Sequence, residues 1–138
     1  RPLRNVGRQH LLNAEEKEMT FQRNHQEEPT DAVGYVARGN RYSRNAVYQR
    51  AIEDYTTAIG LDPGYADAYY NRGCSYYEVG LFDKSIEDLT RAIEIDPGAD
   101  EYYGQRSVVY LFNDQPDLAQ ADQDASDALR FRAQLEGK

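Results

Sequence analysis

Small and aromatic residues recur at three- and four-residue steps along two consecutive segments of the chain. Tyr69, Gly73 and Tyr76 share one face of a predicted helix, because 3.6 residues complete a helical turn. A second apolar stripe follows, with charged residues on the other faces of its helix. It comprises Phe82, Ser85, Ile86, Leu89, Ala92 and Ile93. Gly80 lies between the two segments and can end a helix, so the pattern predicts two amphipathic helices joined by a tight turn.

This two-helix pattern repeats at an offset of 34 residues. Residues 32–65 align with residues 66–99 without a gap, and each unit closes with an Asp-Pro-Gly turn that contains Pro63 or Pro97. Proline and glycine at these places mark the boundary between units. An exact spacing of this kind is typical of tandem structural repeats, so we predict two helix-turn-helix units in this stretch.

A third unit is predicted over residues 100–135. Its first half keeps the offset, but Leu118 and the apolar residues after it lie two positions late relative to Phe82 and its stripe. We therefore expect the turn around residues 113–116 to be two residues longer than the other turns. A long last helix should follow it.

Residues 1–31 form a leader that matches the repeats poorly. A helix is expected at about residues 12–28, because Phe21 and Pro29 fall one period before Tyr55 and Pro63. The leader is either a degenerate half-repeat or an irregular helix that caps the stack. A third alternative is that this segment lies in a groove of its own chain or of a neighbour.

One helical hairpin cannot hide its apolar face from water by itself, so the units must stack side by side. We predict an all-α fold, a right-handed α-solenoid of about three helical hairpins. Gly39 and Gly73 recur where the two helices of a unit approach closely, and their small size is expected to be structural.

The chain resembles the tetratricopeptide repeat (TPR) family. Residues 66–99 match its pattern of large, small and aromatic positions, followed by alanine, an aromatic residue, alanine and a closing proline. Tyrosines replace the usual tryptophan, and arginines replace the usual leucine. The Tyr-Asn-Arg-Gly sequence that begins at Tyr70 is similar to a bacterial subtype.

The arginines that replace leucine recur together with aspartates of the second helix. We predict ion pairs within each unit, Arg38–Asp54 and Arg72–Asp88. The shifted third unit would pair Arg106 with Asp124. Such pairs would join the two helices of each hairpin in a partly buried place.

The resemblance also implies where a partner lies. In tetratricopeptide repeats the first helices line a concave groove, which a peptide or protein segment occupies. The positions that face away from the second helix are the candidate groove residues. They are Val36, Asn40, Ser43, Arg44, Asp67, Tyr70, Asn71, Cys74, Tyr77, Glu78, Glu101, Gln105, Val108, Leu111 and Phe112.

Three-repeat members of the family often hold the acidic C-terminal tail of a heat-shock chaperone with two asparagines and three basic residues. Asn40 and Asn71 match the asparagines, but Val36, Glu101 and Gln105 stand where cations are required. Because the terminal carboxylates would lack their partners, we do not expect a chaperone-tail receptor.

Charge and motif content exclude several other functions. The net charge is −8 and the excess of acid lies in residues 31–138, which argues against a nucleic-acid partner. Cys74 is the only cysteine, and His10 and His25 lack the spacing of metal ligands, so no metal or cofactor is expected. No nucleophile elbow or phosphate loop is found, so we do not expect an enzyme.

The compartment stays open. No membrane span or secretory signal is expected in this chain. The chain begins with Arg1, so we expect a piece of a longer or processed protein. A lone thiol favours the cytoplasm, while a periplasmic or membrane-tethered location through a preceding segment is the alternative. The predicted function is an adaptor or scaffold that binds a peptide, the alternative being a homodimer that forms through uncovered terminal helices.

Overall fold

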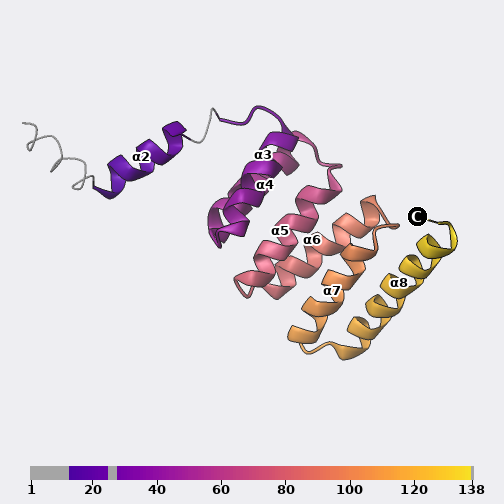
Figure 1. Cartoon of the computed structure of the whole chain (residues 1–138). Coiled ribbons are helices and arrows are strands. Elements are labelled where there is room, and N and C mark those ends of the chain that lie inside the picture. Colours follow the sequence, from indigo (N-terminus) through magenta and orange to yellow (C-terminus); the bar gives the residue numbers. More distant parts are fainter. Residues whose placement is uncertain (1–12, 25–27, 138) are drawn as a thin grey trace, which may run out of the picture.

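The computed structural model describes residues 13–24 and 28–137, with the backbone alone for residues 20–24. Every regular element in this part of the chain is an α-helix (Figure 1). In chain order they are α2 (Ala14–Asn24), α3 (Ala32–Arg44), α4 (Tyr48–Leu61), α5 (Ala66–Glu78), α6 (Phe82–Ile95), α7 (Asp100–Phe112) and α8 (Pro116–Leu135).

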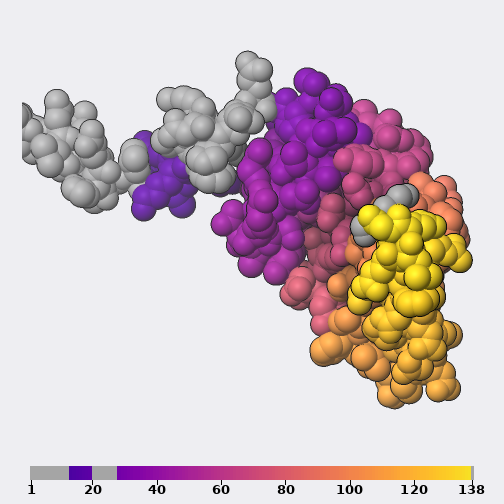
Figure 2. All heavy atoms as spheres, turned by 45° about the vertical axis from the view of Figure 1, so that its right-hand side comes forward, coloured from indigo at the N-terminus to yellow at the C-terminus, as the bar shows by residue number. Residues whose placement is uncertain are grey.

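Helices α3 to α8 form three hairpins that stack in sequence order (Figures 1 and 2). Each second helix packs on the first helix of the next hairpin, α4 on α5 and α6 on α7. The first helices also touch one another, whereas among the described residues the second helices do not. The stack therefore curves toward α3, α5 and α7, and we call the surface that these three helices line the inner face. The chain is an all-α helical-repeat solenoid.

Helix α2 lies to one side of the stack in Figure 1. It begins with a capping box. The Glu16 backbone N–H donates to the Asn13 side-chain oxygen at 2.8 Å, and the Asn13 backbone N–H donates to the Glu16 carboxylate at 3.2 Å. Glu18 pairs with Arg50 of α4 at 2.6 Å. Within the described residues α2 packs on no other helix, so it does not form the packed pair that a half-repeat would supply. The expected end at residue 28 is wrong, because Glu28 is not helical.

The turn inside each hairpin uses one left-handed residue at the same place. Ala46, Gly80 and Asp114 have φ of 59°, 80° and 58°. Glycine adopts this conformation without strain, and aspartate tolerates it better than most residues. The expected two-residue extension of the third turn is wrong, because Asp114 keeps the 34-residue offset and α8 begins at Pro116, one period after Phe82.

The buried residues of α8 confirm that the offset holds. Ala119, Asp122 and Ser126 are buried, whereas Leu118 is 47 % exposed. Ala119 follows Ser85 by one period, and both lie where the helices of a hairpin meet. The Ser85 hydroxyl of α6 donates to the Gly73 carbonyl of α5 at 2.7 Å, and in the third hairpin the direction is reversed, since the Ser107 hydroxyl of α7 donates to the Ala119 carbonyl of α8 at 2.7 Å. Small side chains at these positions let the two backbones approach closely.

An arginine of the first helix binds an aspartate of the second helix in every hairpin. Arg38 donates to both oxygens of Asp54 at 2.9 and 2.8 Å, and Arg72 donates to both oxygens of Asp88 at 2.8 Å. The predicted partner of Arg106 is wrong, since it binds Asp122 at 2.7 and 2.8 Å and not Asp124. The planar guanidinium suits such two-pronged pairs.

The tyrosines of the repeated pattern stack on these arginines. The Arg72 guanidinium lies 5.9 Å from the ring centre of Tyr69 and 5.7 Å from that of Tyr76. Tyr103 and Tyr110 flank Arg106 in the same way, and Tyr35 flanks Arg38. These five tyrosines and Tyr42 are partly buried, and Tyr35 and Tyr42 pack against the buried apolar cluster. The buried tyrosines are Tyr55 and Tyr102.

Two glycines test the close approach of helices. A methyl group on Gly39 would lie 2.6 Å from the Tyr55 ring, while one on Gly60 would meet nothing within 4 Å. We expect Gly39→Ala to lower the free energy of unfolding by about 1–3 kcal/mol because the helices must separate. Gly60→Ala should raise it by about 0.5 kcal/mol through helix propensity. Urea unfolding followed by circular dichroism measures both, and a neutral Gly39→Ala would contradict this packing.

The buried ion pair gives a second test. Burial raises the pKa of the Asp88 carboxyl although Arg72 opposes the shift, so an unpaired Asp88 would be costly. Arg72→Ala should lower the free energy of unfolding by about 3 kcal/mol in the same urea experiment. Arg91→Ala is the control, since the Arg91–Glu94 pair is exposed and its loss should leave stability unchanged. Equal stability of Arg72→Ala and wild type would show that the pair is not structural.

Candidate functional site

The residues that the sequence assigns to a partner belong to α3, α5 and α7, the helices that line the inner face, and two of them serve the fold. Val36 is buried in the apolar cluster that joins α3, α4 and α5. The Asn40 side-chain oxygen accepts a hydrogen bond from the Tyr55 hydroxyl at 2.7 Å. Burial raises the pKa of Tyr55 to about 12. Asn40 therefore anchors α3 to α4.

Tyr70 lies in the middle of the inner face, between α5 and α7. Its ring is 4.9 Å from the ring of Tyr102. The Tyr102 hydroxyl donates to Asp67 at 2.9 Å, which ties the second hairpin to the third. Burial raises the pKa of Tyr70, and the carboxylates of Glu101 and Asp67 raise it further. The centre of the inner face thus combines stacked aromatic rings with acidic neighbours.

An aromatic cluster lies where α5, α6 and α7 meet. Tyr77 is 5.4 Å from Phe112 and 5.9 Å from Phe82, measured between ring centres. Phe112 is 64 % exposed and neighbouring Leu111 is 58 % exposed, while Val108 lies one turn earlier and is 37 % exposed. The Tyr77 side chain combines an apolar ring with a polar hydroxyl, so it suits a surface that contacts water in the free protein and is buried when a partner binds.

Polar and charged residues complete the predicted surface. Asn71 and Gln105 occupy equivalent places on α5 and α7 and are partly buried. Arg44 and Glu78 are exposed at the ends of α3 and α5. Ser43 is partly buried, while Glu101 is exposed near the start of α7.

Cys74 lies among these residues and is partly buried. Burial raises the pKa of its thiol to about 11, and the Glu78 carboxylate adds to the shift. The thiol is therefore protonated at neutral pH and a poor nucleophile. Its contribution to the inner face is an apolar one.

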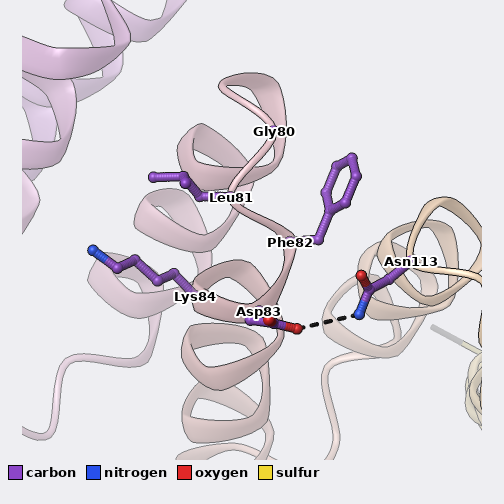
Figure 3. A pocket seen from close by; sticks show the side chains of 6 residues that line it. All are labelled: Gly80, Leu81, Phe82, Asp83, Lys84 and Asn113. Carbon is purple, nitrogen blue, oxygen red and sulfur yellow. Dashed lines mark hydrogen bonds between the residues drawn. The ribbon is translucent and has the colours of Figure 1, made fainter.

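A shallow hollow lies at the turn between α5 and α6 (Figure 3). Gly80, Leu81, Phe82, Asp83 and Lys84 line it together with Asn113, whose side-chain amide donates to Asp83 at 3.2 Å. Most of these side chains are exposed, and the hydrogen bond joins the second hairpin to the third. The hollow is thus a junction between units, and the inner face is the better candidate site.

Residues 13–24 and 28–137 hold neither a cluster of metal ligands nor a membrane-spanning helix. In that part no three His, Cys, Asp or Glu side chains lie so that they could hold a metal ion. No helix there is both long and apolar enough to cross a bilayer. His10 and His25, predicted to be surface residues, lie outside the described residues.

Sequence comparison agrees with the geometry. The tetratricopeptide repeat profile matches residues 66–98, and a second TPR repeat profile matches residues 35–80. None of the curated proteins matches the chain.

Solved structures share the fold. The second TPR of Spaghetti (RPAP3), bound to the HSP90 peptide SRMEEVD, superposes with a TM-score of 0.70 at 27 % identity, over 72 % of this chain and 93 % of that one. MamA superposes with a TM-score of 0.72 at 30 % identity, over 75 % of this chain but only 60 % of the MamA chain. The TPR2B domain of yeast Sti1, in a pHsp70 complex, gives 0.71 at 24 % identity, over 77 % and 83 %.

The helical-hairpin stack with its lined inner face defines a helical-repeat protein. The matched profiles and the superposed structures place it more narrowly: the chain is a tetratricopeptide repeat protein. Tetratricopeptide domains are generally protein–protein interaction modules.

Two residues of this surface escaped the sequence pattern. Tyr102 is buried beneath Tyr70, yet its counterpart one period earlier is Ala68, so the repeat gives no hint of an aromatic residue there. The hydroxyl contact of Tyr55 with Asn40 depends on how α3 and α4 pack. A buried tyrosine commonly finds a hydrogen-bond partner, which is the signal that could have suggested both contacts.

Proposed function

We propose that this protein binds a segment of another protein on the inner face and acts as an adaptor or scaffold. The observation that carries the proposal is the exposed apolar surface on α5 and α7. Leu111 and Phe112 are more than half exposed, and Val108 and the Tyr77–Phe112 ring pair continue the patch. Contiguous exposed apolar surface of this kind is typical of an interaction site.

The polar residues beside this patch suit a polypeptide partner. Asn71 and Gln105 lie on adjacent first helices, and an amide side chain can both donate to and accept from a peptide backbone. Tyrosines and aliphatic side chains next to them can cover the partner's apolar side chains. An extended or helical segment of a protein would satisfy both kinds of contact.

The solved relatives support a peptide as the class of ligand. RPAP3 and Sti1 TPR domains are bound to HSP90 and HSP70 peptides. In this chain Glu101 and Gln105 occupy places where the resemblance requires cations, and Val36 is buried. The ligand that we propose is therefore a peptide, but not the C-terminal tail of a chaperone.

Self-association through the terminal helix is the alternative function. Phe131 and Leu135 near the end of α8 are 61 % and 72 % exposed, which favours it. One observation opposes it: the stripe that reads Ile86, Leu89, Ile93 on α6 becomes Gln120, Gln123, Asp127 one period later. A polar stripe of this kind gains little from packing against a second copy.

Light scattering coupled to size exclusion separates the two functions. We expect the 15.8 kDa chain to remain a monomer as its concentration rises, because the α8 stripe is polar. A mass near twice that value, lost in Phe131→Ser/Leu135→Ser, would instead establish the dimer.

The adaptor function predicts a loss of binding without a loss of stability. Asn71→Ala/Leu111→Ala should abolish capture of specific partners in a pull-down from a lysate, because both side chains line the inner face. Leu61→Ala is the matched control, since Leu61 is a similarly exposed leucine at the end of α4. Circular dichroism should show the same helicity and melting temperature for all three proteins. Equal recovery of partners by the inner-face variant and wild type would contradict the proposal.

A further inference from the structure

The charges on the first helices differ in how they are paired. The arginines repeated in the hairpins are all committed to ion pairs. Arg72 binds Asp88 of its own hairpin and donates to Thr56 of the preceding one at 3.1 Å, and Arg106 does the same with Asp122 and Thr90. These cations lie between successive second helices, away from the inner face, and the aspartates neutralise them.

The inner face keeps carboxylates that no such pair neutralises. Asp67, Glu78 and Glu101 are exposed there, on α5 and α7. Arg44 is the one basic residue among the candidate groove residues, and it belongs to the first hairpin. The central and terminal parts of the inner face therefore carry an excess of negative charge.

The ionisable groups between these carboxylates respond to their field. Burial is the largest cause of the raised pKa of Tyr70, Tyr102 and Cys74. Cys74, Glu101 and Asp67 raise the pKa of Tyr70 further. Glu78 adds to the raised pKa of Cys74, and Asp67, Asp96 and Glu101 add to that of Tyr102.

Glu78 lies next to the exposed apolar patch at the ends of α5 and α7, whereas Asp67 and Glu101 lie at the starts of these two helices. Glu78 is the residue after Tyr77, whose ring packs on Phe112, and Glu101 is the residue before Tyr102, which packs on Tyr70. A ligand lying over the aromatic rings would have carboxylates beside it at both ends of α5 and at the start of α7. The surface of α5 and α7 can therefore make both apolar contacts and ion pairs with one ligand.

We propose that the inner face selects a basic peptide segment, in which lysine or arginine side chains pair with Glu78, Glu101 and Asp67 while apolar side chains cover Tyr77, Leu111 and Phe112. This inference rests on the proposed peptide-binding function and gives the chemical class of the ligand. Long basic side chains fit this surface because their methylene groups lie on aromatic rings while their charges reach carboxylates. An acidic peptide would meet repulsion at the same places.

Two blocked peptides test the sign of this preference. One is SRMEEVD, the peptide bound by the RPAP3 domain, and the other is SRMKKVK, in which each acidic residue is replaced by lysine. Fluorescence anisotropy with the full chain should show at least roughly ten-fold tighter binding of SRMKKVK in low salt. Raising NaCl from about 50 to about 500 mM should weaken it, because salt screens exposed charges.

Charge-reversal variants locate the binding surface. Glu78→Lys/Glu101→Lys should weaken binding of SRMKKVK at least roughly ten-fold. Glu53→Lys/Glu87→Lys is the matched control, with the same change of net charge made at exposed positions of α4 and α6. This control should bind like wild type. Equal weakening by both variants would mean that only the overall charge matters, which overturns the inference.

The remaining outcomes separate this inference from the adaptor function. Equal binding of both peptides, a preference for SRMEEVD, or no measurable binding of SRMKKVK overturns the basic-peptide inference. The adaptor function is decided independently by partner capture with Asn71→Ala/Leu111→Ala. If that variant loses its partners while peptide charge has no effect, the adaptor function stands and the inference fails. If it retains them, the adaptor function fails too.

Discussion

The Arg–Asp pair inside each hairpin is the contact on which the rest of this structure depends. It joins the first helix to the second, and in the second and third hairpins the same guanidinium also reaches a threonine of the preceding unit. Tyrosines of the first helix lie beside each arginine, which shields it from water while leaving its hydrogen bonds intact. Buried pairs of this kind add little net stability compared with apolar residues. We infer that their contribution here is to fix the register of one helix against another.

This register determines the curvature and therefore the binding surface. Arg72 and Arg106 hydrogen-bond to both flanking second helices, which are otherwise not in contact within the described part of the chain, while the first helices touch. The curvature brings Tyr70 onto Tyr102 and Tyr77 onto Phe112, which are contacts between different hairpins. Asp67, Glu78 and Glu101 on α5 and α7 take no part in these arginine pairs and stay exposed.

Variation within the repeat shows where the regular pattern changes. Ser75 occupies the place of Val109 one period later, and its buried hydroxyl has no hydrogen-bond partner among the described residues. Leaving a hydroxyl unsatisfied costs about 1–3 kcal/mol. The polar stripe on α8 is a second departure, and it ends the apolar seam that runs from α4 through α6. Stability is therefore unevenly distributed along the stack.

The sequence by itself determined the helical hairpins, their 34-residue period, the left-handed Gly80 turn and the first two ion pairs. These features follow from spacing along one helix, which periodicity records directly. Contacts between helices were decided only by the tertiary structure. In α8 the residues in register with Leu118 and those in register with Ala119 are both spaced like one face of a helix. Packing on α7 buries the Ala119 face, and Asp122 of that face therefore pairs with Arg106. The same limit explains Asn40, whose partner Tyr55 lies on a different helix, because local spacing does not encode which face meets which neighbour.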